Sequence, residues 1–128
     1  MNEVVMDASA ILAIFQGERG SEILTAEIMS SAIVSTVNLA EVQSKLVKNG
    51  YTPDEAWENA LTLVPEMALF TAEQAKIAGS LIATTQKFGL SLGDRSCLAL
   101  ALSLGAEVYT TEKVWKNLNL GIPIHVIR

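Results

Sequence analysis

The sequence predicts an α/β fold with a parallel sheet, and three observations support this prediction. Short β-rich runs alternate with helical stretches along the chain. These runs are apolar throughout, as is typical of strands that are covered on both faces. Capping residues precede the helical stretches, and glycines follow several of them. The predicted strands are EVVM (3–6), AIVS (32–35), MALF (67–70), EVYT (107–110) and IHVI (124–127).

The helical stretches carry local start and stop signals. Thr52-Pro53-Asp54-Glu55 combines a capping threonine, a proline at the first helical position and a glutamate that completes a capping box. The stretch from Thr71 to Gln74 repeats this pattern without the proline. Helices are expected to end at Gly50, Gly89 and Gly105. Because the sequence has no internal repeat or linker, residues 1–128 are expected to form a single domain.

Composition limits the class of protein. Of 128 residues, 50% are hydrophobic and 18% are charged, which excludes a disordered chain. The apolar runs are shorter than the roughly 18 residues of a membrane span, and the N-terminal segment has no basic leader. The single cysteine, Cys97, can form no internal disulfide. We therefore expect a cytoplasmic protein with no membrane contact.

The segment SLGDRSCLALALSLG, residues 91–105, predicts a helix that is apolar on nearly every side. Its first turn nevertheless carries Asp94 and Arg95. Charged groups at the start of a buried helix are costly unless another group pairs with them. The sequence therefore requires a partner for Asp94.

Acidic residues also follow the predicted strands. Asp7 follows the first strand directly, and Glu41 lies near the start of the helix after the second. Glu112 follows the fourth strand, and Asp94 begins the helix that leads into it. Ligands of open α/β sheets bind beyond the carboxyl ends of the strands. We therefore expect these four acids to converge on one crevice.

Each acid also has a simpler interpretation. Asp7 fits a helix N-cap, and Asp94 and Glu112 fit first-turn positions, where the helix dipole favours an anion. Glu41 lies four residues before Lys45, which fits a solvent-exposed ion pair on one helix. The residues taken one at a time leave both interpretations open.

The four acids together favour a metal site. Carboxylates gathered in one crevice repel one another and raise each other's pKa, which a bound cation relieves. Oxygen ligands without histidine or cysteine favour Mg²⁺ or Mn²⁺ over zinc. We therefore expect a divalent cation among these side chains.

With these motifs the chain resembles the PIN-domain family, and within it the VapC-type toxin ribonucleases of VapBC toxin–antitoxin pairs. The resemblance rests on VVMDASAILAIF, IVSTVNLAEV, LSLGDRSCLALA and YTTEKVW. It implies a three-layer α/β/α PIN-like fold with a five-stranded parallel sheet. It also implies a metal-dependent endoribonuclease that hydrolyses RNA phosphodiester bonds with a Mg²⁺-activated water.

The resemblance carries the catalytic and metal-binding roles to Asp7, Glu41, Asp94 and Glu112. The family commonly has Thr-Ala-Asp after its fourth strand, where this chain has Thr-Thr-Glu. The longer side chain of Glu112 leaves direct and water-mediated metal binding both open. Ser9 and Thr110 are expected to support the site with their hydroxyls, with plain capping as the alternative.

The net charge of −5 by itself counts against a nucleic-acid partner. Without the four proposed ligands the charge would be −1, so much of the acidity belongs to the predicted site. Arg95, Lys45 and Lys113 flank these acids and are expected to contact RNA phosphates, although surface solubility explains them equally well.

The resemblance also implies two protein partners, a small VapB-like antitoxin and a second copy in a homodimer. Three apolar stretches could serve these contacts or belong to the core, namely ILAIF (11–15), the helix with Trp57, and the run through Ile77, Leu81 and Ile82. His125, the single histidine, is expected to be structural. The alternative to an enzyme is a catalytically weak or inactive PIN-fold binding module, which the glutamate at position 112 leaves open.

Overall fold

The computed structural model describes residues 3–128 and contains one five-stranded parallel sheet. The strand order is β3-β2-β1-β4-β5, so the first strand lies at the centre. The strands are β1 (Val4–Met6), β2 (Ala32–Ser35), β3 (Glu66–Ala68), β4 (Glu107–Thr110) and β5 (Ile124–Val126). All five predicted strands are confirmed. The third lies slightly earlier than expected, because Phe70 has left the sheet and donates its backbone N–H to Thr36 Oγ1 at 3.3 Å.

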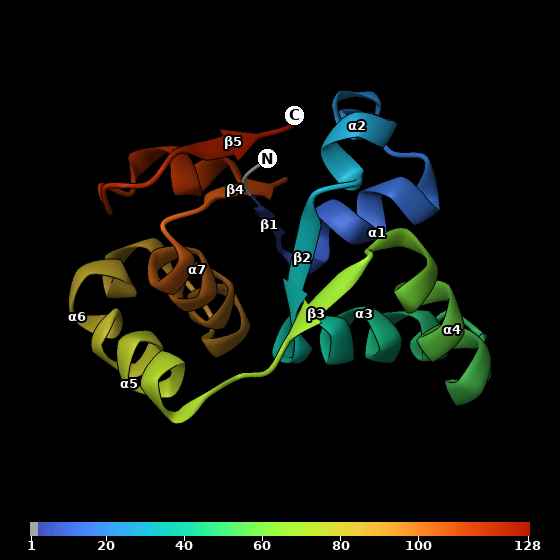
Figure 1. Cartoon of the computed structure of the whole chain (residues 1–128), viewed down its shortest axis with the longest axis horizontal. Coiled ribbons are helices and arrows are strands. Elements are labelled where there is room, and N and C mark those ends of the chain that lie inside the picture. The colour runs from blue at the N-terminus through green and yellow to red at the C-terminus, as the bar shows by residue number, and fades with distance from the viewer. Residues whose placement is uncertain (1–2) are drawn as a thin grey trace.

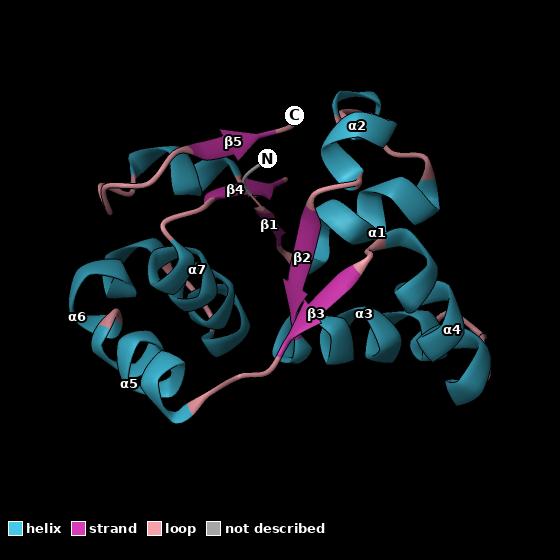
Figure 2. Ribbon diagram, viewed as in Figure 1, coloured by secondary structure: helices cyan, strands magenta, loops and turns pink. Residues whose placement is uncertain are grey.

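Helices form the outer layers on both faces of the sheet (Figure 1). Figure 2 shows the strands as a twisted band between the two groups of helices. The α-helices are α1 (Ala8–Gln16), α2 (Ala26–Met29), α3 (Thr36–Lys48), α4 (Pro53–Leu63), α5 (Ala72–Ser80), α6 (Ile82–Thr85) and α7 (Leu92–Leu104). The described residues also form three 3₁₀ turns, η1 (Ser21–Ile23), η2 (Gln86–Phe88) and η3 (Lys113–Asn117), the last of which lies between β4 and β5.

Two hydrophobic cores lie on opposite faces of the sheet. Met6 and Val34 pack against α1, α3 and α4 on one face. Val5 and Val108 pack against α7 on the other face, together with parts of α5. Because neighbouring residues of a strand point to opposite faces, β1 contributes to both cores. This arrangement confirms the predicted three-layer α/β/α architecture.

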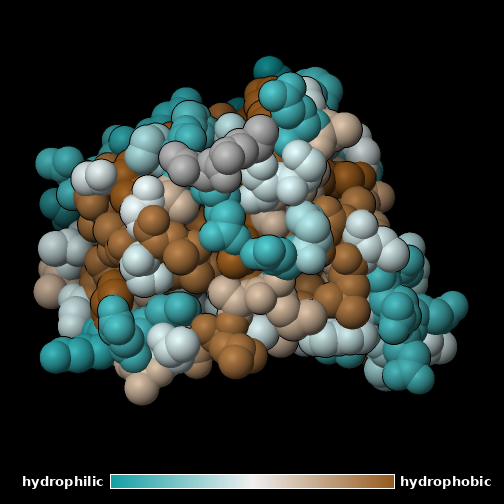
Figure 3. Space-filling model, viewed as in Figure 1, coloured by the Kyte–Doolittle hydropathy of each residue, from teal (hydrophilic) through white to brown (hydrophobic). Residues whose placement is uncertain are grey.

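The edge strands differ from the prediction that every strand is covered on both faces. β1 and β2 are fully buried, whereas Glu66 and Met67 of β3 are exposed. Helices cover the centre of the sheet, so an edge strand with one neighbour remains open to solvent. Figure 3 shows apolar surface over the segment that joins β3 to α5, where Leu69 is 75% exposed.

The helix predicted from residues 91–105 is α7, and its central residues from Ser96 to Ala101 are buried. Its ends are not, because Leu92 is 57% exposed and Leu104 is 45% exposed. The helix ends at Gly105, whose φ of 63° is left-handed and favours glycine. The predicted caps at Thr52 and Thr71 are also present.

The apolar stretches proposed for partner contacts contribute mainly to the cores. Ile11 is fully buried, and Trp57 is partly buried against the same core. Ile82, in contrast, is 41% exposed. His125 lies on the edge strand β5, where Nε2 is 2.7 Å from Glu107 Oε1. None of the helices in residues 3–128 is long and apolar enough to cross a bilayer.

Candidate active site

Asp7 lies at the carboxyl end of the central strand and is the N-cap of α1. Its Oδ1 accepts hydrogen bonds from Ser9 Oγ at 2.7 Å and from the backbone N–H of Ala10 at 2.8 Å. Its Oδ2 accepts a hydrogen bond from Thr110 Oγ1 at 2.6 Å. The residue is only 3% exposed. The capping interpretation of Asp7 is therefore confirmed, and the chain holds this carboxylate in one orientation.

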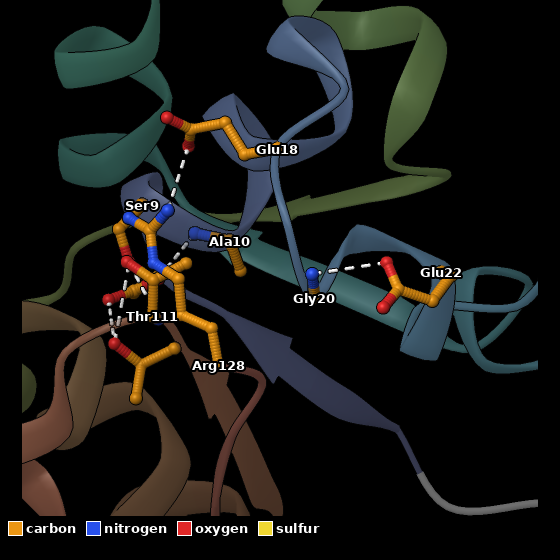
Figure 4. Close-up of polar contacts among 9 residues, drawn as sticks. Ser9, Ala10, Glu18, Gly20, Glu22, Thr111 and Arg128 are labelled. Atoms are coloured by element: carbon orange, nitrogen blue, oxygen red, sulfur yellow. Dashed lines mark hydrogen bonds and ion pairs between the residues drawn. The ribbon is translucent and has the colours of Figure 1, made fainter.

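The end of β4 completes this network. Thr110 Oγ1 accepts the backbone N–H of Glu112 at 3.0 Å, and Ser9 Oγ accepts the backbone N–H of Thr111 at 3.0 Å. Figure 4 shows Ser9, at the start of α1, beside Thr111, which follows β4. Both hydroxyls that the sequence singles out thus contact Asp7. They also join the ends of two adjacent parallel strands.

Asp94 and Glu41 are held by separate local contacts. Asp94 forms a capping box with Ser91, whose backbone N–H donates to Asp94 Oδ2 at 2.9 Å. Glu41, on α3, is exposed, and its Oε1 accepts a 2.7 Å hydrogen bond from Asn38 Nδ2. Asn38 Nδ2 also donates to the carbonyl oxygen of Gly93 at 3.0 Å. Asn38 therefore links the Glu41 carboxylate to the first turn of α7.

Burial changes the chemistry of Asp7. The pKa of this carboxyl is raised from 3.8 to about 6, mainly by loss of hydration and to a smaller extent by the negative charge of Asp94. The hydrogen bonds from Thr110, Ala10 and Ser9 oppose this shift, because they stabilise the ionised form. The sequence predicted a raised pKa from mutual repulsion. The direction is confirmed, but burial is the larger cause.

The charge of Asp94 also affects Glu41 and Cys97. Burial of its carboxyl raises the pKa of Glu41, the hydrogen bond from Asn38 lowers it, and the charge of Asp94 raises it. Burial raises the pKa of the Cys97 thiol well above its usual range, and the charges of Asp7, Asp94 and Glu41 add to this shift. The charges of three of the four predicted acids therefore act on the Cys97 thiol in α7.

The predicted tight cluster of four carboxylates is not present. Across residues 3–128, no three acidic, histidine or cysteine side chains lie close enough together to share one metal ion. The reason is local: Asp7 and Asp94 are each turned toward a helix N-terminus, and Asn38 holds Glu41. Glu112 is exposed at the start of η3 and makes no side-chain capping bond there.

The donor groups nevertheless fit a divalent cation. Three hydrogen bonds fill three of the roughly four acceptor positions of the Asp7 carboxylate, which leaves one position on Oδ2. Mg²⁺ commonly keeps several waters and uses only one or two carboxylates, so a shared chelate of three is not required. A cation near Asp7 and Asp94 would also offset the burial of one charge and the repulsion between both.

The predicted cations occupy different surroundings. Lys45 lies on α3 one turn after Glu41, and both residues line a shallow depression on that helix. Among the ion pairs of residues 3–128, none joins Lys45 to Glu41. Lys113 is exposed beside Glu112. Arg95 is only partly exposed, and its Nη1 donates to the carbonyl oxygen of Ala78 on α5 at 2.9 Å.

Sequence reasoning missed two residues of this site, Asn38 and Gly93. Asn38 is 1% exposed although it is polar. Because it lies four residues before Val42, it falls on the buried face of α3, and a polar residue on such a face is an informative signal. Gly93 is the site of a close approach: a Cβ there would lie 2.6 Å from Cδ of Glu41. No local pattern indicates that contact.

The parallel sheet, the helices on both faces and the acids that follow the strands define an α/β protein with a candidate site at the carboxyl edge of its sheet. A family model for the PIN domain matches residues 4–119. The chain therefore belongs to the PIN domain family, as the sequence motifs indicated. No curated protein matches the sequence.

Several solved structures share this fold. Mycobacterium tuberculosis VapC20, described as a sarcin–ricin loop cleaving toxin, has a TM-score of 0.74 at 17% identity, over 94% of this chain and 99% of that chain. A DNA-bound VapBC from Salmonella typhimurium has a TM-score of 0.73 at 18% identity, over 97% of each chain. A toxin–antitoxin complex from Klebsiella pneumoniae has a TM-score of 0.71 at 19% identity, over 94% of this chain and 95% of that chain. At these identities the likeness establishes the fold.

Proposed function

We propose that this protein is a metal-dependent endoribonuclease and the toxin of a type II toxin–antitoxin pair. The observation that carries this proposal is Asp7, a buried carboxylate with a raised pKa at the centre of the sheet edge, near the charges of Asp94 and Glu41. Burial and nearby negative charges are unfavourable for this carboxylate in the metal-free protein, and a bound cation would relieve both. The structural neighbours described as toxins that act with antitoxins support the biological role.

In this proposal Mg²⁺ or Mn²⁺ binds near Asp7, Asp94 and Glu41, with one or two of these carboxylates as direct ligands and the rest acting through water. Glu112 lies farther out and also acts through water. The bound ion would supply Lewis acidity toward the phosphodiester and lower the pKa of water. Ser9 and Thr110 hold the Asp7 carboxylate ionised and in a fixed orientation. The helix N-termini at Asp7 and Asp94 favour the negative charge of both groups.

Positive side chains beside the acids would contact the RNA backbone. Lys45 and Lys113 are exposed, so both can reach phosphates without breaking an internal contact. Arg95 already bonds to α5, so a phosphate contact would compete with its bond to Ala78. A cognate VapB-like antitoxin and a second copy of this chain are the proposed protein partners, and the cytoplasm is the proposed location.

A decisive experiment incubates the purified protein with total cellular RNA, with and without Mg²⁺ or Mn²⁺, and maps the cut ends. The proposal predicts cleavage that needs the metal, disappears in Asp7→Asn and leaves 5′-phosphate ends. A folded wild-type protein that leaves the RNA intact under every metal condition would favour a binding module that has lost turnover.

A further inference from the structure

A buried asparagine on α3 reaches Gly93 in the first turn of α7, which lies 55 residues later in the sequence. Asn38 Nδ2 donates to Glu41 Oε1 at 2.7 Å and to the Gly93 carbonyl oxygen at 3.0 Å. Both partners are acceptors, so the amide nitrogen must face them and the orientation of the side chain is fixed. The residue is 1% exposed.

The oxygen atom of the Asn38 amide has no hydrogen-bond partner in the described structure. Asn38 Oδ1 is buried and accepts no hydrogen bond in the described structure. Buried acceptors are normally satisfied by protein or ordered water, so an unpaired one at a candidate site calls for an explanation. A hydrating water of a bound cation would provide the missing donor.

The hydrogen bonds of Asn38 place the Glu41 carboxylate close to Gly93 of α7. Gly93 has no side chain, and the Glu41 carboxylate occupies the space where a Cβ would stand. Gly93 immediately precedes Asp94, so the amide of Asn38 sets the position of one proposed ligand against the segment that carries another. Without this hydrogen bond, the exposed Glu41 side chain would lose the contact that orients its carboxylate.

We propose that Asn38 is a positioning residue, which fixes the Glu41 carboxylate beside the first turn of α7 and offers Oδ1 to a water that hydrates the bound cation. This inference rests on the proposed function. It adds a neutral residue that acts on the metal in two ways, through the position of Glu41 and through a hydrating water. Groups that orient a ligand in this way typically change metal affinity by roughly 10- to 100-fold when they are removed.

The test compares Mn²⁺ affinity, measured by isothermal titration calorimetry on the full chain, in four proteins: wild type, Asn38→Leu, Glu41→Gln and the double variant. Asn38→Leu should weaken binding by roughly 10- to 100-fold. The double variant should lose less affinity than the product of the two single losses, because part of the effect of Asn38 passes through Glu41. Wild-type affinity in Asn38→Leu, or losses that multiply in the double variant, would overturn the inference.

Gln74 provides the matched control, because it is a second buried amide whose oxygen has no partner in the described structure. Gln74→Leu should leave Mn²⁺ affinity unchanged, and an equal loss would mean that both substitutions merely loosen the fold and would refute the positioning role. If Asn38→Leu does not fold, Asn38→Ser takes its place, since its short hydroxyl cannot span both acceptors.

The same measurements separate this inference from the proposed function. Weaker binding in Glu41→Gln with normal binding in Asn38→Leu would overturn the role of Asn38 and leave the metal site standing. Absence of Mn²⁺ binding in the wild type, or binding that Asp7→Asn and Glu41→Gln leave unchanged, would overturn both.

Discussion

Thr110 Oγ1 donates a 2.6 Å hydrogen bond to Asp7 Oδ2, across 103 residues of sequence. The bond is possible because β1 and β4 are adjacent and parallel, with Met6 paired to Tyr109. The two residues therefore emerge side by side at the carboxyl edge of the sheet. Thr110 thus opposes the cost of burying a charge at the centre of the protein.

Thr110→Val removes this donor and keeps the shape of the side chain. A hydrogen bond to the ionised carboxylate lowers its pKa, so its loss should raise the pKa of Asp7 above about 6. We expect the acidic limb of the pH–rate profile for metal-dependent RNA cleavage to move to higher pH. Thr110→Ser, which keeps the hydroxyl, should retain the wild-type profile. An unchanged limb in Thr110→Val would show that Asp7 does not control this step.

Asp7→Asn should stabilise the metal-free protein above pH 7. Burial raises the pKa of Asp7 in the folded state from 3.8 to about 6. Below pH 3.8 the carboxyl is protonated in both the folded and the unfolded chain, so its full contribution to stability is present. This contribution is lost as the pH rises through 6, because the unfolded chain ionises more readily. Asparagine caps a helix nearly as well and carries no charge. Urea unfolding at pH 8 with EDTA should show a gain of up to roughly 3 kcal/mol, which disappears near pH 4.

Asp54→Asn is the control for this measurement, because Asp54 is an exposed carboxylate in the first turn of α4. Its free energy of unfolding should change little at either pH. A clear loss of stability in Asp7→Asn at pH 8 would instead mean that Asp7 serves mainly as a structural cap.

Gly93→Ala should reduce activity while the fold is retained. The new Cβ would lie 2.6 Å from Cδ of Glu41, and the flexible end of that side chain can move aside. Displacement of a ligand by about 1 Å can cost on the order of 100-fold in rate. Gly79→Ala is the matched control, because nothing lies within 4 Å of its Cβ position. Equal cleavage rates and melting temperatures in both variants would exclude a role for Glu41.

Glu112→Gln should cost less activity than Asp94→Asn. Glu112 is exposed just before η3, whereas Asp94 is held by Ser91 at the start of α7. We expect Glu112→Gln to slow RNA cleavage by roughly tenfold, as for a group that acts on a metal through water, and Asp94→Asn to abolish it. Equal losses in single-turnover assays would make Glu112 a direct ligand.

Arg95→Ala should reduce the stability of the protein, whereas Lys113→Ala should reduce its affinity for RNA. Arg95 bonds to the carbonyl oxygen of Ala78, so its loss should lower the free energy of unfolding by about 1–3 kcal/mol. Lys113 is exposed, so its substitution should leave stability within about 0.5 kcal/mol. Lys113→Ala should weaken RNA binding and reduce the slope of the logarithm of the binding constant against the logarithm of salt concentration by about one. Fluorescence anisotropy at several salt concentrations and thermal melts separate the two effects.

Local patterns were sufficient to predict the strands and the helix ends. The run AIVS became β2 with the same bounds, and Thr52 with Glu55 formed the predicted capping box. These features depend on residues within about four positions of one another, so a single sequence contains the required information. The covering of β3 was predicted wrongly, because composition alone does not show which strand lies at an edge.

By itself the sequence determined the α/β class, the family and the identity of the acids. Only the tertiary structure decided how those acids are held. Burial, more than mutual repulsion, raises the pKa of Asp7, and the contact of Asn38 with Gly93 spans 55 residues. The physical reason is that burial and long-range hydrogen bonds depend on how separate segments pack, whereas caps and strands depend on neighbours along the chain.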